Sequence, residues 1–150
     1  MLRNNFIILI IILFFSQIII TYSEEKFLSL KKNKVNVRYG PSFDFPVKYI
    51  YEKKNLPIKQ IDKKENFRRI IDHKKNSGWI HVSQLKKVSS VIAVEDKIMF
   101  EKPTVFSKPV AKIKIGRLLV IQKCEKEWCK VKTGDFKGWV DKNNLWGLIN

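Results

Sequence analysis

A chain of 150 residues can form one ordinary domain or two very small ones, which excludes a large multidomain fold. Its net charge is +16, from 30 Lys and Arg against 14 Asp and Glu, and the lysines are spread along the chain instead of forming one block. Such diffuse positive charge is typical of a solvated surface. It also suits an anionic partner such as a wall polymer, a lipid headgroup or a nucleic acid.

The first 23 residues have the pattern of an export signal. Arg3 supplies the positive charge, residues 6–20 are apolar with two exceptions, and small residues precede Glu24 at a suitable cleavage site. The alternative is an uncleaved membrane anchor, for which the apolar run is short and interrupted. We predict a signal helix over 1–23 and a mature protein of net charge +15 that is periplasmic or secreted. Export takes the chain away from nucleic acid, so no nucleic-acid partner is expected.

The remainder of the chain contains the same pattern twice. Three pairs of segments align: residues 34–37 with 97–100, 66–70 with 127–131, and 78–80 with 138–140. A repeat of this length indicates one small domain that has been copied. Residues 88–94 link the copies and are apolar enough to be packed. We predict domains over 24–88 and 89–150.

The predicted elements of both copies are short strands. Residues 35–39 alternate between apolar and polar, which is typical of a half-buried strand. The other strands predicted in the first copy are 47–51, 56–61, 67–71 and 78–82, followed by a short turn at 84–85 onto a closing strand. Those predicted in the second are 97–100, 110–115, 118–122, 128–132 and 137–140. No helix is predicted after residue 23, and Trp146, beyond the last strand, covers either the barrel end or the first copy. These patterns predict an all-β protein with two small barrels.

The motifs of both copies resemble a known family. The first copy opens with Val35-Asn36-Val37-Arg38-Tyr39-Gly40-Pro41-Ser42, and the two copies end on Gly78-Trp79 and Gly138-Trp139. With these motifs, residues 27–148 resemble the bacterial SH3-like domain in the tandem form of exported proteobacterial proteins. The resemblance implies two SH3-like five-stranded β-barrels in tandem that bind cell-wall peptide or a polypeptide partner, without catalysis or cofactor. One departure is Phe67, where the family usually has Trp.

Aromatic residues crowd the opening of the first copy beside Arg38. An arginine among aromatic side chains can grip a peptide carboxylate with two hydrogen bonds, whereas the structural alternative pairs Arg38 with Asp72. Strand alternation cannot bury every aromatic residue, so they form either a recognition surface or the interface between the barrels. The candidate ligand-binding residues are Arg38, Tyr39, Phe43, Phe45, Tyr49 and Trp79. In the second copy Glu101–Thr104 replaces Arg38–Pro41, so the same mode of binding is not expected there.

Other residues are predicted to be structural. Gly40 permits a positive φ and Pro41 pre-sets the turn after the strand. A Trp repeated at one place in both copies is typical of core or rim packing. The set expected to be structural is Gly40, Pro41, Gly78, Gly138 and Trp139.

Cys124 and Cys129 are the only cysteines. With residues 126–127 as the turn, the two face each other across a hairpin within disulfide reach, and export to an oxidising compartment favours the bond. A redox site would prefer C-x-x-C, and a zinc site would need His73 or His81, which lack ligand spacing. We predict a structural disulfide and no metal or cofactor.

Catalytic signatures are missing from the sequence. Hydrolysis needs a nucleophile with a base, paired carboxylates or an open metal site, and none of the corresponding motifs occurs. We predict a non-catalytic, exported binding or adaptor protein that recognises cell-wall peptide or a periplasmic protein. The alternative is a basic protein that binds polyanions or membrane surfaces through its charge.

Overall fold

Residues 26–148 form two antiparallel β-sheets in succession, and these are the residues that the computed structural model describes. The only helical segment among them is a single 3₁₀ turn, Val82–Gln84. No helix in this part of the chain is long and apolar enough to cross a membrane. The predicted all-β fold is confirmed, whereas the predicted signal helix over 1–23 lies outside the described residues.

The two sheets have equivalent strand orders. The first contains β1 (Lys26–Leu30), β2 (Val35–Arg38), β3 (Val47–Tyr51), β4 (Pro57–Lys64), β5 (Phe67–Ile71), β6 (Ser77–His81) and β7 (Leu85–Lys87). The second contains β8 (Ser90–Ala93), β9 (Lys97–Phe100), β10 (Pro109–Ile113), β11 (Leu118–Glu125), β12 (Trp128–Thr133), β13 (Phe136–Asp141) and β14 (Leu145–Trp146). Neighbouring strands follow the order β3-β2-β6-β5-β4-β1-β7 in the first sheet and β10-β9-β13-β12-β11-β8-β14 in the second. We call the two sheets the first and second repeats.

Each repeat has seven strands where the sequence predicts five or six. The additional strands are β1 in the first repeat and β8 and β14 in the second, whereas β7 is the closing strand predicted after the turn at 84–85. Strand β14 spans only two residues, too few for an alternating pattern to be recognised. All four residues of β8 are buried, so this strand also lacks alternation. The prediction that residues 88–94 are packed is confirmed for 90–93, whereas Val94 is exposed.

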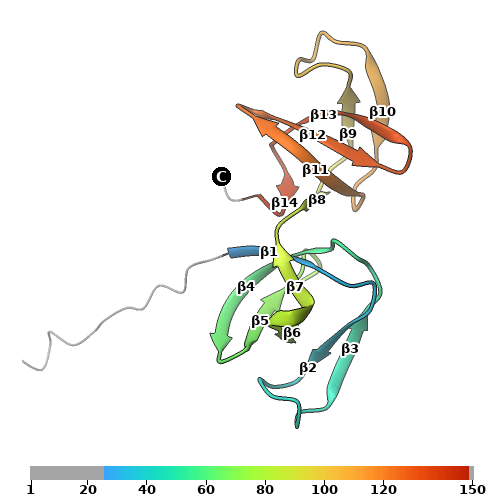
Figure 1. Ribbon diagram of the computed structural model, residues 1–150. Helices are drawn as coiled ribbons and strands as arrows, with labels where there is room; N and C mark the ends of the chain where they lie inside the picture. The colour runs from blue at the N-terminus through green and yellow to red at the C-terminus, as the bar shows by residue number, and fades with distance from the viewer. Residues whose placement is uncertain (1–25, 149–150) are drawn as a thin grey trace, which may run out of the picture.

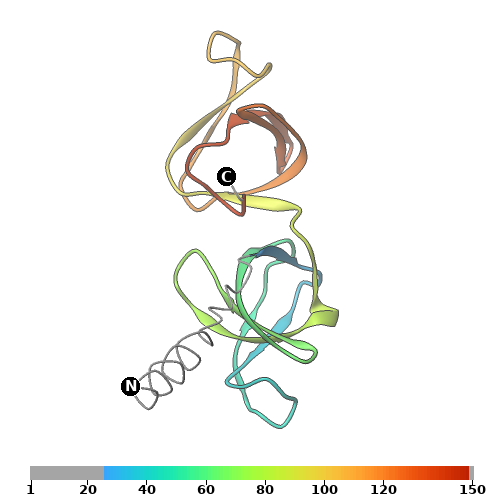
Figure 2. The same cartoon turned by 90° about the vertical axis from the view of Figure 1, so that its left-hand side faces the viewer.

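Each sheet curls around its own hydrophobic core, and the two repeats lie one above the other (Figures 1 and 2). The core of the first repeat is Leu30, Val35, Val37, Leu56, Ile58, Ile70, Ile80 and Ile92. The core of the second is Val91, Ala93, Met99, Ile113, Leu119, Cys129, Val131, Val140 and Leu145. Strand β8 contributes to both cores, because successive side chains of a strand point to opposite sides. It therefore joins the repeats by packing as well as by the chain.

Trp146 of β14 packs against the first repeat. Its ring lies edge-on to Phe27, with centroids 5.2 Å apart, and its Nε1 donates a hydrogen bond to the Pro57 carbonyl oxygen at 3.3 Å. The ammonium of Lys75 lies 5.9 Å from the indole centroid. Of the two positions predicted for Trp146, the one over the first repeat is therefore correct.

The strand register corrects the predicted repeat alignment by one residue. Arg38 of β2 lies opposite Trp79, and Phe100 of β9 lies opposite Trp139, so Phe100 is equivalent to Arg38 and not to Val37. A shift of one residue exchanges the two faces of a strand. The error arose because β9 carries three consecutive apolar residues, 98–100, which hide its alternation.

The corrected register places a lysine in the core of the second repeat. Lys97 takes the position of Val35, and its side chain is only 2% exposed. Its ammonium pairs with the Asp141 carboxylate at 2.9 and 3.1 Å and with Glu95 at 3.1 Å. A buried charge needs such partners, because removal from water is otherwise strongly unfavourable.

The predicted disulfide is confirmed between β11 and β12. Cys124 lies opposite Cys129 and Glu125 opposite Trp128, with the two cysteine Cα atoms 4.0 Å apart. The hairpin turns at Lys126, which adopts a positive φ of 45°. The bond cross-links the outer end of this hairpin.

Candidate functional site

The loop between β2 and β3 is held by Arg38. Its Nη1 donates hydrogen bonds to the carbonyl oxygens of Phe43 at 3.3 Å and Phe45 at 2.7 Å. The Phe45 ring lies directly over Gly40, where a Cβ would come within 2.5 Å of ring atoms. Gly40 is therefore needed for close approach and not for the predicted positive φ. The predicted pairing of Arg38 with Asp72 is wrong. Arg38 donates its hydrogen bonds to the two loop carbonyls, and Asp72 accepts hydrogen bonds from the side chains of Tyr51 and Asn76.

Aromatic side chains gather around Arg38 on the sheet face opposite the core. The Arg38 guanidinium carbon lies 5.3 Å from the Phe43 ring centroid, and Phe43 lies 5.2 Å from Phe67 and 5.1 Å from His81. Phe67 opposes His81 and Trp79 opposes Arg38, so these side chains share one face. We call Arg38, Phe43, Phe67, Trp79 and His81 the outer-face cluster. Phe43 is fixed by these neighbours and still 63% exposed, which makes it available to a partner.

The equivalent face of the second repeat is closed. Phe100 takes the place of Arg38 and lies edge-on to Trp128, with centroids 5.9 Å apart. Two lysines cover Trp139, with the ammonium of Lys123 at 5.3 Å and that of Lys130 at 5.8 Å from its ring centroid. Trp139 is only 6% exposed as a result. The two repeats thus present different chemistry at equivalent positions.

Three tyrosines form a second group in the first repeat. The ammonium of Lys48 lies 5.6 Å from the Tyr39 ring centroid and 6.0 Å from that of Tyr49. Tyr49 and Tyr51 share a hydrogen bond between their hydroxyls at 3.3 Å, and the Tyr51 hydroxyl donates to Asp72 at 2.9 Å. This chain of contacts runs from the exposed Tyr39 to the buried Asp72.

The Asp72 carboxylate is the centre of a hydrogen-bonded turn. Burial alone would raise its pKa, but hydrogen bonds from Asn76, from Tyr51 and from the Lys74 amide outweigh burial and hold the pKa below its usual value. Burial, reinforced by Tyr49 and by the Asp72 charge, raises the pKa of Tyr51 far above that of an ordinary tyrosine. The phenol thus stays protonated and donates to an ionised carboxylate.

The structure separates the six candidate binding residues. Three belong to the outer-face cluster (Arg38, Phe43 and Trp79), two surround Lys48 (Tyr39 and Tyr49), and Phe45 covers Gly40. The interface between the repeats contains other side chains, chiefly Trp146 and Phe27. Sequence reasoning missed Phe67 and His81 as members of the cluster. Strand alternation could have identified His81, because it lies two residues after Trp79 on the same strand and therefore on the same face.

The arrangement supports binding better than chemistry. Within residues 26–148, no group of three His, Cys, Asp or Glu side chains could hold a metal ion. His81 accepts the Ser83 amide hydrogen on Nδ1 and contacts the rings of Phe43 and Phe67, so it has a structural environment. An exposed ring beside a guanidinium can instead pack against a ligand and hydrogen-bond a carboxylate.

Comparison with known proteins identifies the family. Residues 31–87 and 93–147 each match the model described as "Bacterial SH3 domain", one match in each repeat. The chain belongs to the bacterial SH3 domain family. Bacterial SH3 domains are binding domains, in general non-catalytic, and they are typically extracellular or periplasmic.

Solved structures show distant similarity to this bacterial SH3 protein. The structures of NlpC2 and NlpC1 from Trichomonas vaginalis are 11% and 12% identical to it, each with a TM-score of 0.38. Both alignments cover 83% of this chain, but only 49% and 46% of the respective structures. The chain thus spans about half the length of these proteins. No curated protein matches it.

Proposed function

We propose that this bacterial SH3 protein is an exported, non-catalytic binding or adaptor protein whose first repeat recognises cell-wall peptide or a periplasmic protein. In this proposal residues 1–23 direct export, and domains over 24–88 and 89–150 form the mature protein. The observation that carries the proposal is the outer-face cluster, in which a fixed and 63% exposed Phe43 ring lies beside Arg38.

The chemistry of a peptide ligand fits this cluster. Within the described part of the chain, Arg38 uses only Nη1 for its hydrogen bonds, both to loop carbonyls. Its other guanidinium N–H groups therefore remain to grip a carboxylate in bidentate fashion. Apolar parts of the same ligand can pack on Phe43 and on the half-buried Trp79. Because the loop is pre-organised by Arg38, little ordering entropy opposes binding.

The second repeat supports assignment of the site to the first. Phe100 at the position of Arg38 removes the guanidinium, and Trp139 is covered by lysines. A ligand that needs both a guanidinium fork and an open aromatic ring finds them together in the outer-face cluster and not at the equivalent positions of the second repeat. The second repeat then serves as a support for the first, to which it is joined through β8 and Trp146.

Retention of mature protein on purified wall sacculi, from low to high salt, tests the proposal. Burial of one aromatic ring contributes roughly 1.5–3 kcal/mol, so Phe43→Ala should weaken retention by tenfold or more. Phe136→Ala is the matched control, because Phe136 is also an exposed ring (53%) but lies on β13 of the second repeat. Arg38→Lys keeps the charge and loses the fork, so it should weaken retention as well.

The salt series separates this function from the alternative. Retention that resists salt and depends on Phe43 supports recognition of wall peptide. Retention that disappears with salt and is equal in Phe43→Ala and Phe136→Ala would reduce the function to the +15 charge of the mature chain. No retention at any salt would exclude the wall and leave a periplasmic protein as the partner.

A further inference from the structure

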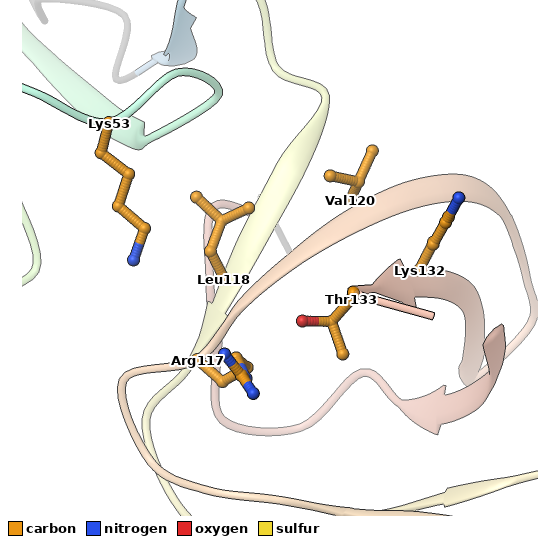
Figure 3. A pocket seen from close by; sticks show the side chains of 7 residues that line it. Lys53, Arg117, Leu118, Val120, Lys132 and Thr133 are labelled. Atoms are coloured by element: carbon orange, nitrogen blue, oxygen red, sulfur yellow. The ribbon is translucent and has the colours of Figure 1, made fainter. Parts of the chain in front are cut away.

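A cavity of about 330 Å³ lies where the two repeats meet. It is lined by Lys53, Arg117, Leu118, Val120, Lys132, Thr133 and Gly134 (Figure 3). Lys53 belongs to the first repeat, in the loop between β3 and β4, whereas the other residues belong to β11, to β12 and to the turns beside them. The volume is at the lower end of that of small-molecule sites.

One hydrogen bond joins the two repeats beside this cavity, and a second fixes the loop of the first repeat. The Ser90 hydroxyl of β8 donates to the Asn55 carbonyl oxygen, two residues from Lys53, and the Asn55 amide donates to the Leu30 carbonyl oxygen at 3.0 Å. Ser90 is also paired with Val120 on β11. The loop of the first repeat is therefore fixed beside the strand that carries the opposite wall.

The cavity has an uncompensated positive charge. Three of its seven lining residues are cationic and none is acidic. The ion pairs formed within residues 26–148 involve four other lysines: Lys34, Lys97, Lys114 and Lys123. Glu52, next to Lys53 in the sequence, pairs with Lys34. A cleft lined by positive charges and apolar side chains concentrates positive potential and attracts anions.

The side chains in Figure 3 indicate which groups would contact an anion. Lys53 extends into the cavity from the first repeat, Arg117 and the Thr133 hydroxyl lie on the opposite wall, and the Lys132 ammonium points away. A guanidinium provides a fork for an oxyanion, an ammonium adds a point charge, and a hydroxyl donates one further hydrogen bond. Leu118 offers an apolar surface to the rest of the ligand.

We propose that this junction cavity is a binding site for an oxyanion, a phosphate or a carboxylate, carried on a ligand with an apolar portion. Lys53 and Arg117 bind the anion, one from each repeat, so the site exists only when the repeats are packed together. It is separate from the outer-face cluster and does not depend on the function proposed above.

Titration of the protein with inorganic phosphate, and separately with acetate, at constant ionic strength tests this site. The signals to follow are the amide resonances of Thr133 and Gly134 in ¹⁵N-correlated NMR spectra. We expect a saturable shift of both, with affinity at least tenfold weaker in Arg117→Gln and Lys53→Gln. Lys108→Gln removes the same charge from the loop between β9 and β10 and should bind as the unmodified protein does.

The outcomes separate a site from general attraction to a basic protein. Saturation with phosphate alone assigns the oxyanion as phosphate, and saturation with acetate alone assigns it as carboxylate. Shifts that never saturate, or that weaken equally in Lys108→Gln, would overturn the proposal. Phe43→Ala should leave the titration unchanged, so failure of the wall-binding function and failure of this site are distinguishable.

Discussion

The buried Lys97 gives the sharpest test of the energetics of the second repeat. Asp141→Ala removes the carboxylate that accepts two of its hydrogen bonds and leaves only Glu95 as a partner. Loss of one partner of a buried pair typically costs 3–5 kcal/mol. Because the Asp141 side chain is 38% exposed and Glu95 remains, we expect the lower end, about 3 kcal/mol. Part of this is the lost hydrogen bond from the Asn143 amide at 3.1 Å.

Replacement of the lysine itself should be far less harmful. Lys97→Val restores the residue type that the first repeat has at Val35, and the two carboxylates it abandons both reach solvent. We expect a cost of about 1 kcal/mol or less, since an apolar side chain can replace a buried ion at little net cost. The same argument predicts that the double variant Lys97→Val/Asp141→Ala is more stable than Asp141→Ala alone.

Urea unfolding measures these differences. Tryptophan fluorescence and circular dichroism would follow the transition with the disulfide intact, and comparison requires equal m-values among the variants. Suppose that Lys97→Val lowers the free energy of unfolding as much as Asp141→Ala does, and that the two losses simply add in the double variant. The ammonium would then not be a buried charge that depends on Asp141. Such additivity would refute the reasoning.

Three further predictions follow from other contacts. Because its pKa is lowered in the folded protein, Asp72 contributes stability above its unfolded pKa of about 3.9, and this is lost as pH falls through the folded value. In Asp72→Asn, the urea midpoint should therefore fall less steeply as the pH is lowered into the acid range. If the midpoint falls as steeply as in the unmodified protein, Asp72 is not the cause of the acid destabilisation. Reduction of the Cys124–Cys129 bond should cost about 2 kcal/mol, since it closes a short loop, and no change in the urea midpoint would contradict this. Gly138→Ala should lower the free energy of unfolding in urea by about 2 kcal/mol, because the new Cβ would lie 2.6 Å from the Phe100 carbonyl oxygen. An unchanged free energy would show that the backbone of β9 can shift to make room at no cost.

Strands with clear alternation were predictable from the sequence. Residues 47–51 form β3 as predicted, and the strand predicted over 35–39 forms β2 over 35–38; the pairing of Cys124 with Cys129 follows from a two-residue turn between alternating strands. The strands β8 and β14 were harder, since they are too completely buried or too short to alternate. Their positions depend on tertiary pairing that one sequence does not reveal.

The candidate site was only partly predictable for a related reason. Adjacent residues of a strand point to opposite faces, but a bulge between Val37 and Arg38 leaves Lys48 of β3 without a partner in the register. Such a bulge cannot be read from alternation, so the tyrosines around Lys48 and the cluster around Arg38 appeared in the sequence as one aromatic group. The lysine in the core was equally hidden, because Lys97 resembles the many surface lysines of this chain.

Because the two repeats share strand β8, the repeating unit of the sequence is not an independent folding unit. It begins between the two family matches and ends on the first residue of the second match, and its Ile92 completes the core of the first repeat while Val91 and Ala93 complete that of the second. A cut before or after this strand would leave one of the two cores without a wall. The two repeats are therefore joined by packing on one shared buried strand and not only by a connecting segment of chain, so a change in this strand is expected to disturb both cores at once.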